Sequence, residues 1–299
     1  MNSSYLKGIP WQRFKDFISP AADRFLILCE ILKEAELYYS ITEIAGNRHF
    51  IISPRPPPDN DEPRSLKTPV ILVAHYDRCE GSPGANDNSA GVFLLIETAI
   101  KLNKGGEKKW IIIFTDKEEL KPGEDITNQG AYTLASGLKT LKMKNARIFC
   151  FDVCGAGDSL IISTTLDYLL NQEGSRGKLQ KSILDLRNMA LNTARELRTL
   201  KVFLAPTPFS DDAGFFRAGL AAQTITVLPV QEYSRLNAEL RKNPKFTEVL
   251  INAEMRKTVQ TKAIPETWRT LNGPSDSHLR LTPQHFRMVT RFAEALCKS

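Results

Sequence analysis

The sequence is poor in cysteine and histidine, with five cysteines and four histidines in 299 residues. Small secreted domains held by disulfides carry more cysteines, usually in even number, so this count indicates reduced thiols. Cys150 and Cys154 lie close together in the sequence, but no second pair is there to complete a thiolate metal site. We expect both to be small, buried, apolar residues.

Long apolar runs are also missing. No apolar stretch reaches the length of about 18 residues that spans a membrane. The first residues, MNSSYLKGIPWQRFKDF, contain no uninterrupted apolar run of signal-peptide length. These absences predict a soluble protein in the cytoplasm that has no membrane partner.

Neither sign of charge dominates, since 40 Lys and Arg face 34 Asp and Glu, a formal net charge of +6. The basic residues are spread over segments such as Lys178 to Lys201 and Arg235 to Lys262. They lack the interleaved aromatic residues of a nucleic-acid-binding stripe. We therefore expect no nucleic-acid partner, and the sequence carries no signal for the oligomeric state.

Three catalytic signatures are absent. The sequence contains no HExxH, and Ser89 does not lie in a G-x-S-x-G because position 87 is Asp. The pair of glycines at 155 and 157 lacks a third glycine in register, so a turn is favoured over a dinucleotide-binding loop. Zincin-type, α/β-hydrolase-type and dinucleotide-dependent chemistry are therefore disfavoured.

The chain does contain a regular alternation of apolar strands and helices from Val70 onward. Strands that are hydrophobic throughout and alternate with helices indicate an α/β fold with a parallel sheet covered on both faces. The predicted strands are 70–74, 110–114, 146–151, 159–163, 201–204 and 223–228, and the predicted helices are 90–102, 130–141, 178–200 and 283–297.

Other segments are less regular. Trp11 to Leu37 has helical spacing broken once at Pro20, which predicts one or two amphipathic helices. Ser40 to Ser53 predicts a strand pair, and the proline-rich stretch Pro54 to Arg64 predicts a loop. We expect a single domain over 1–299, with a helical segment at 1–37 and a segment at 233–270 that could be inserted or mobile.

Side chains of metal-ligand type follow three of the predicted strands. His75 and Asp77 follow the first strand, Asp116 to Glu119 follow the second, Asp152 follows the third, and a helix-entry loop adds Asp87. We expect these groups to converge, because the carboxyl ends of parallel strands lie on one edge of the sheet. Imidazole and carboxylates without thiolates suit Zn²⁺ or a neighbouring transition metal.

Two features of this cluster predict water activation. Asp77 lies two residues beyond His75, close enough to accept a hydrogen bond from the imidazole and fix its tautomer, so we place Asp77 among the catalytic residues. Of the adjacent carboxylates Glu118 and Glu119, one could bind the metal while the other acts as a general base. The combination is typical of a hydrolase.

At these residues the sequence resembles the co-catalytic di-zinc aminopeptidases, the family that also contains the glutaminyl cyclases. The matching segments occur in family order from Val70 to the C-terminus, and the first three together are specific. They are AHYD (74–77), PGANDNSAGV (83–92), FTDKEE (114–119), FDVCG (151–155), SDDAGFFRAGL (210–220) and NGPSDS before LTPQ (272–284).

The resemblance implies a three-layer αβα sandwich with a mixed, mostly parallel central sheet. It implies that Asp87 bridges two metals, that His75 and Asp152 complete one metal site, that Glu119 contributes to the other, and that Glu118 is the general base. In such a pair one metal polarises the scissile carbonyl, and both help to lower the pKa of the attacking water.

The sequence departs from the family pattern at two positions. The family's last metal ligand is a histidine, and Asn272 stands there, whose carbonyl oxygen is a weaker zinc ligand than imidazole. The histidine of the family's SDHxxF segment is Asp212. His278 lies six residues after Asn272, out of register for a simple replacement. The second metal could be absent, it could be completed by Asn272, His278 or water, or the site could be decayed.

We therefore predict a metal-dependent, aminopeptidase-like exopeptidase that releases N-terminal residues from short peptides with one or two Zn²⁺ ions, Co²⁺ and Mn²⁺ being alternatives. Asp152 and Asp212 are the acids expected to hold the substrate's ammonium group. Two other functions stay open: a catalytically impaired binding or scaffold protein, and a glutaminyl cyclase-type acyltransferase. The resemblance implies that a cyclase needs the metal-ligand set that Asn272 impairs.

Overall fold

An eight-stranded mixed sheet forms the centre of the computed structural model, which describes residues 7–55, 69–121, 123–173, 177–198 and 200–299. The order of the strands across the sheet is β1-β2-β4-β3-β5-β8-β6-β7. Their bounds are β1 Tyr39–Ile44, β2 Asn47–Ile52, β3 Val70–His75, β4 Trp110–Thr115, β5 Arg147–Phe151, β6 Ser159–Ser163, β7 Val202–Ala205 and β8 Ala222–Leu228.

The parallel pairs lie in the middle of this sheet, apart from β6 and β7, which pair in parallel at one edge. β3 pairs in parallel with β4 and with β5, and β5 pairs in parallel with β8. The antiparallel pairs lie nearer the edges, where β1 pairs with β2, β2 with β4, and β6 with β8. Every residue of β3 and β8 is buried, as expected for strands that are apolar throughout and covered on both faces.

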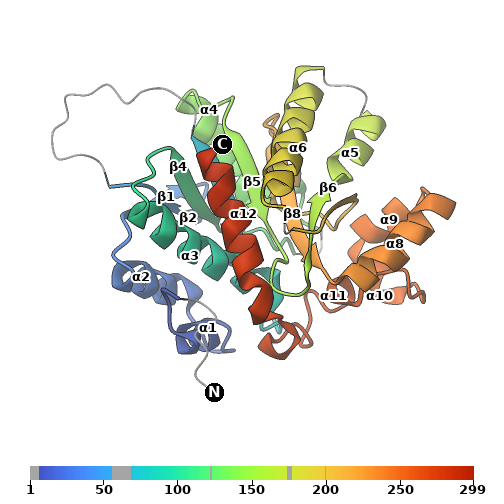
Figure 1. Cartoon of the computed structure of the whole chain (residues 1–299), viewed down its shortest axis with the longest axis horizontal. Helices are drawn as coiled ribbons and strands as arrows, with labels where there is room; N and C mark the ends of the chain where they lie inside the picture. Colours follow the sequence, from blue (N-terminus) through green and yellow to red (C-terminus); the bar gives the residue numbers. More distant parts are fainter. Residues whose placement is uncertain (1–6, 56–68, 122, 174–176, 199) are drawn as a thin grey trace.

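Helices cover both faces of the sheet. On one face α12 (Phe286–Lys298) lies between α3 (Ala90–Lys104) and α6 (Lys178–Glu196), as Figure 1 shows. On the other face α4 (Gly130–Thr140) packs against α7 (Asp211–Arg217). The predicted three-layer αβα sandwich with a mixed, mostly parallel sheet is confirmed.

The N-terminal segment forms two helices rather than one, α1 (Trp11–Phe17) and α2 (Arg24–Glu34), with Pro20 in the connection. Helix α1 packs beside α3, because its Phe14 and Phe17 contact Phe93 with ring centroids 5.1 Å and 5.5 Å apart. The predicted strand pair after them is β1 and β2. Most of the predicted loop 54–64 lies outside the described residues.

Several helices were not predicted. They are α5 Thr165–Glu173, α7 Asp211–Arg217, α8 Val230–Lys242, α9 Phe246–Ile251, α10 Ala253–Thr258 and α11 Glu266–Arg269. The last four lie beyond β6 at one end of the sheet, where Leu236, Phe246 and Trp268 share an apolar cluster with Ile161 of β6 (Figure 1). Residues 233–270 are therefore largely helical, and their status as an insertion within one domain remains a prediction.

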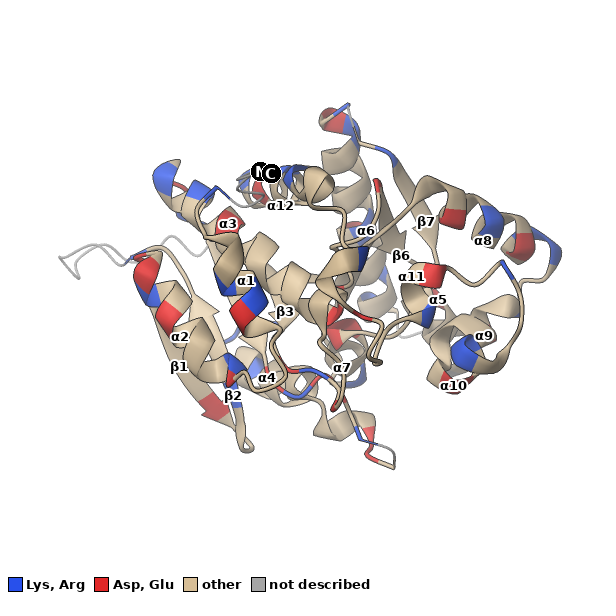
Figure 2. Cartoon of the chain, turned by 90° about the horizontal axis from the view of Figure 1, so that it is seen from below, with Lys and Arg blue, Asp and Glu red and all other residues tan. Residues whose placement is uncertain are grey.

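The cysteines and surface charges agree with the composition. All five cysteines are unpaired, and Cys150 and Cys154 are buried as expected. Figure 2 shows Lys and Arg interspersed with Asp and Glu over α1, α2 and α8. Among the described residues, no helix is both long and apolar enough to cross a membrane.

Candidate metal centre

The predicted ligand-bearing loops meet at the carboxyl ends of three neighbouring strands. β3 lies between β4 and β5, and His75 at its end pairs with Thr115 at the end of β4. The chain leaves β3 for β4 on one side and later returns to β5 on the other. This point, where the strand order reverses, is where open α/β sheets bind their ligands.

His75 lies at the centre of a group of carboxylates. Its side chain is fully buried, and its Nε2 atom lies 3.1 Å from Asp87 Oδ1 and 3.5 Å from Asp152 Oδ1. Neither Nε2 nor Asp152 Oδ1 makes a hydrogen bond to any described residue. Ligand atoms of a tetrahedral zinc site, at 2.0–2.1 Å from the ion, lie about 3.3 Å apart. The set His75, Asp87 and Asp152 therefore fits a single Zn²⁺ ion.

A second group consists of His75, Glu118 and Glu119, whose ligand atoms lie within 4.8 Å of one another. Asp77 joins the two strand ends: its Oδ1 lies 3.3 Å from His75 Nδ1, as the sequence spacing predicted. The same carboxylate accepts hydrogen bonds from the backbone N–H groups of Glu118 and Glu119, over 3.1 Å and 3.0 Å. Asp77 thereby fixes the backbone of the paired glutamates and lies beside the imidazole, whose Nδ1 atom meets no hydrogen-bond criterion among the described residues.

The loop that carries Asp87 is held by residues that the sequence analysis did not single out. Asp276 accepts hydrogen bonds from the backbone N–H groups of Asn86 and Asp87, over 2.8 Å and 3.0 Å. The Asn86 Oδ1 atom accepts one from the backbone N–H of Gly155, over 2.7 Å. Asn86 and Asp276 belong to the segments PGANDNSAGV and NGPSDS, and those matches were the only sequence signal for them.

Of the candidate second ligands, His278 does not join these groups. Among the described residues, neither ligand group includes His278, which lies in a short 3₁₀ turn, His278–Arg280. The Oδ1 atom of Asn272 is buried and makes no hydrogen bond to any described residue. Cys79, which was not predicted, donates its thiol hydrogen to Glu119 Oε2 over 3.1 Å. The half of the centre around Glu119 thus has no imidazole other than that of His75.

Backbone strain accompanies the ligand positions. Lys117 precedes Glu118 and has a φ of +57°, and Val153 follows Asp152 with a φ of +53°. Asn272 has a φ of +58°. This conformation is a genuine outlier for a β-branched residue such as valine. Residues held in it concentrate at sites where the surrounding structure enforces an unusual geometry.

Burial and crowding shift the pKa values of the site. Burial raises the pKa of Glu118 well above its usual value, and nearby Glu119 and Asp152 add to the rise. Burial and the charge of Asp87 raise the pKa of Glu119 to about 8. Burial lowers the pKa of His75, but the carboxylates, that of Asp152 foremost, outweigh this and raise it. A cluster with this excess of negative charge favours a bound cation.

A buried cation in the helices at the end of the sheet interacts electrostatically with this cluster. The side chain of Arg256 in α10 is buried, and its Nη1 donates to the carbonyl of Leu250 over 2.6 Å. Burial lowers the pKa of Arg256, whereas the charges of Asp87, Glu119 and Glu118 oppose that change. Of the carboxylates that act on Arg256, Glu118 and Glu119 belong to the second ligand group and Asp87 belongs to the first.

Two further acids lie at the start of α7. Asp211 and Asp212 are each only 1% exposed, and burial raises the pKa of both to about 7. Asp211 Oδ2 accepts a hydrogen bond from the Thr115 hydroxyl over 2.7 Å. Among the described residues, Asp212 is in neither group of ligand atoms.

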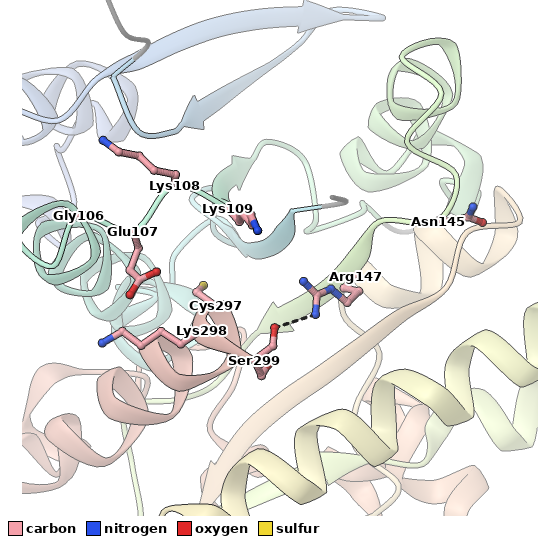
Figure 3. A pocket seen from close by; sticks show the side chains of 9 residues that line it. All are labelled: Gly106, Glu107, Lys108, Lys109, Asn145, Arg147, Cys297, Lys298 and Ser299. Atoms are coloured by element: carbon pink, nitrogen blue, oxygen red, sulfur yellow. Dashed lines mark hydrogen bonds between the residues drawn. The ribbon is translucent and has the colours of Figure 1, made fainter. Parts of the chain in front are cut away.

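A cavity of about 720 Å³ lies at the other end of the strands from the metal centre (Figure 3). Lys109 precedes β4 and Arg147 begins β5, so the cavity lies at the amino ends of these strands. Arg147 Nη1 donates to the carbonyl oxygen of Ser299 there, over 3.1 Å. The residues that line it are Gly106, Glu107, Lys108, Lys109, Asn145, Arg147, Cys297, Lys298 and Ser299, none of which belongs to the metal centre.

The family model described as peptidase family M28 matches residues 58–272, more than half of the chain. The chain belongs to peptidase family M28. This confirms the resemblance to the co-catalytic zinc exopeptidase family that is seen in the sequence. No curated protein matches the chain.

Solved structures of two aminopeptidases and a glutaminyl cyclase share the fold at low sequence identity. The zinc aminopeptidase BSAP from Bacillus subtilis is 17% identical over 83% of this chain and 49% of its own, with a TM-score of 0.51. The LapA aminopeptidase of Legionella pneumophila is 15% identical over 96% of this chain and 69% of its own, with a TM-score of 0.59. A glutaminyl cyclase from Porphyromonas gingivalis is 15% identical over 96% of this chain and 94% of its own, with a TM-score of 0.60. The chain therefore spans about half the length of BSAP.

Proposed function

We propose that this member of family M28 is an aminopeptidase that releases N-terminal residues from short peptides. The observation that carries the proposal is the group formed by His75, Asp87 and Asp152, whose spacing fits one Zn²⁺ ion. Glu119 would contribute to a second ion, with Asp87 between the two. The chemistry that Zn²⁺ supplies in such a set is Lewis acidity, which polarises a carbonyl and makes water a stronger acid.

Glu118 is the proposed general base. Its Oε2 atom lies 4.0 Å from His75 Nε2, so the carboxylate faces the centre, while its Oε1 accepts a hydrogen bond from Gln129. A carboxylate buried among other acids holds a proton more strongly, which suits it to take a proton from water and pass it to the leaving amine. Asp77 would act through His75 by keeping the ring nitrogen Nε2 directed at the centre.

Asp152 and Asp212 are the proposed acids for the substrate's ammonium group. Asp152 supports this role through its place beside His75, since an acid at the centre can also face the free amine of a peptide. Asp212 is fully enclosed at the start of α7, so its part depends on a cavity that opens when substrate binds. Asp152 could therefore bind the ammonium group where it lies, whereas Asp212 could bind it only after the site opens.

The second ion is proposed to bind more weakly than the first. Its half of the centre offers Asp87 and Glu119 but has Asn272 in place of an imidazole ligand. The buried guanidinium of Arg256 acts on the same carboxylates and offsets their charge. Zn²⁺ is the expected ion, with Co²⁺ or Mn²⁺ able to replace it, and a cytoplasmic location is part of the same proposal.

Hydrolysis of a panel of amino-acid anilides by the purified protein, with added Zn²⁺, Co²⁺ or Mn²⁺, tests this function. Glu118→Gln is expected to abolish turnover while bound metal stays at the wild-type level. Glu43→Gln, a change on the exposed edge strand β1, is the matched control and should leave both unchanged. Equal loss of metal and turnover in Glu118→Gln would show that base and ligand are assigned the wrong way round.

The same assay separates the two alternative functions. No bound metal and no turnover with any of the ions would overturn the peptidase and leave a binding or scaffold protein. Peptides with an N-terminal glutamine distinguish the cyclase, because cyclisation releases ammonia and leaves the peptide bond intact, whereas an aminopeptidase releases glutamine.

A further inference from the structure

Arg24 makes more side-chain hydrogen bonds near the metal centre than its place in an N-terminal helix would suggest. It is the first residue of α2, and its side chain is 6% exposed. Its guanidinium donates to five oxygen atoms: through Nη1 to the carbonyls of Tyr76 (3.0 Å) and Asp77 (2.9 Å), and through Nη2 to the carbonyls of Pro83 (2.8 Å) and Gly84 (3.2 Å) and to Ser89 Oγ (2.8 Å).

These five acceptors belong to the two segments that carry metal ligands. Tyr76 directly follows His75, and Asp87 lies between Gly84 and Ser89. A guanidinium presents its N–H groups in a rigid, planar fork, so it fixes the separation of the groups on its two sides. Arg24 thereby sets how far the end of β3 lies from the Asp87 loop.

The surroundings of Arg24 hold it in this position. The guanidinium carbon lies 4.7 Å from the centroid of the Phe17 ring. A Cβ atom on Gly84, whose φ is +57°, would lie 2.8 Å from Arg24 Nη2, so the close approach requires glycine. Burial and the charge of Arg78 lower the pKa of Arg24 to about 9, which leaves it protonated at neutral pH.

We propose that Arg24 is a positioning residue for the metal centre: by joining the His75 and Asp87 segments, it sets the affinity of the centre for its metal. The proposal concerns a residue outside 58–272, the part of the chain that the family model matches. It rests on the proposed ligand set His75, Asp87 and Asp152. Partners of this kind, one step removed from the ligands, are typically worth about 10- to 100-fold in metal affinity.

Competition with a chromophoric chelator for Zn²⁺ tests the proposal on the full chain. Arg24→Lys keeps the charge but loses the fork, and it should weaken Zn²⁺ binding about 10- to 100-fold. Ser89→Ala removes one of the five acceptors and should weaken binding less. The visible absorption of bound Co²⁺, which reports the coordination geometry, should change in Arg24→Lys. Ser89→Ala supplies a milder test where Arg24→Lys does not fold.

Arg187→Lys is the matched control, because Arg187 is also a buried arginine and its Nη1 and Nη2 atoms donate to the carboxylate of Asp167, over 2.8 Å each, outside both ligand groups. It should lower the melting temperature without changing the Zn²⁺ affinity. Arg24→Lys and Ser89→Ala proteins that bind Zn²⁺ as tightly as wild type would overturn the positioning role and leave the metal centre standing. A wild-type chain that binds no Zn²⁺ would overturn the ligand set and this role together.

Discussion

Gln129 Nε2 donates a hydrogen bond to Glu118 Oε1 over 3.1 Å. Gln129 is 2% exposed and lies just before α4, so the contact joins the loop after β4 to the helix layer behind it. With Oε1 engaged in this way, Oε2 of the same carboxylate is the oxygen that faces His75. The amide of Gln129 thus selects which oxygen of the proposed base points at the centre.

Gln129→Met is therefore expected to lower kcat about 10- to 100-fold with little change in KM. Methionine has a similar volume but cannot donate, so the carboxylate would lose its orientation while substrate contacts remain. Steady-state kinetics with an amino-acid anilide and metal analysis of the same sample measure the effect. A rise in KM at unchanged kcat, or loss of bound metal, would contradict an orienting role for Gln129.

The second half of the centre gives a prediction about stoichiometry. Wild-type protein should hold one tightly bound Zn²⁺ per chain after dialysis, and Asn272→His should raise this toward two because it restores an imidazole. The φ of +58° at Asn272 is tolerated by histidine, one of the residues enriched in that region. Elemental analysis of the dialysed protein gives the number of Zn²⁺ ions per chain.

Arg256→Gln supplies the companion experiment. Removing the buried cation should strengthen binding of the second ion to Asp87 and Glu119, most clearly when combined with Asn272→His. Arg241→Gln, on the last turn of α8, is a control that should leave the count at one. If Asn272→His binds no more metal than wild type, Asn272 is not at the ligand position.

The central fold was predictable because its signals are local. Strands such as β3 and β4 are apolar at nearly every position, and runs of this kind occur where both faces are covered. The convergence of His75 and Asp152 then followed from the rule that parallel strands end on one edge. Their proximity, 3.5 Å between Nε2 and Oδ1, also depends on β3 and β5 being neighbours in the sheet, which the sequence did not predict.

The supporting residues were not predictable because their contacts are distant in sequence. Arg24 and Ser89 are 65 positions apart, and Asp276 and Asn86 are 190 apart, so neither pairing leaves a local pattern. α8 was missed for a different reason: of its thirteen residues only Leu236 is buried, so its apolar stripe is narrow. Short helices such as α11 are held by tertiary packing, here around Trp268.

Asp212 predicts a pH dependence of stability. Its pKa is about 7 in the folded chain against an ordinary value of 3.8, so between these values the folded state binds the proton more tightly than the unfolded state. Stability from this group is greatest below about pH 4 and declines as pH rises to about 7. Asp212→Asn, which stays neutral, should therefore be more stable than wild type at pH 8, by about 4 kcal/mol as an upper limit, and equally stable at pH 4.

Urea unfolding at both pH values, with EDTA present so that metal binding does not contribute, measures the difference. Asp185→Asn, an exposed change on α6, is the control and should show no such pH-dependent gain. A variant less stable than wild type at pH 8 would mean that the Asp212 carboxylate is stabilised by a partner in its charged form.

Metal removal should destabilise the protein, because an ion that binds only the folded chain stabilises it by mass action. With free Zn²⁺ at 100 times the dissociation constant the gain is about 2.7 kcal/mol, which corresponds to roughly 4 °C in melting temperature for a chain of this size. EDTA should remove this gain from wild type but have little effect on Asp152→Asn, which has lost a ligand oxygen.

Asp158→Asn is the matched control, because Asp158 pairs with Lys201 over 2.7 Å and is not among the ligand groups. This variant should respond to EDTA as wild type does. An EDTA response in Asp152→Asn equal to that of wild type would place the tightly bound metal elsewhere in the chain.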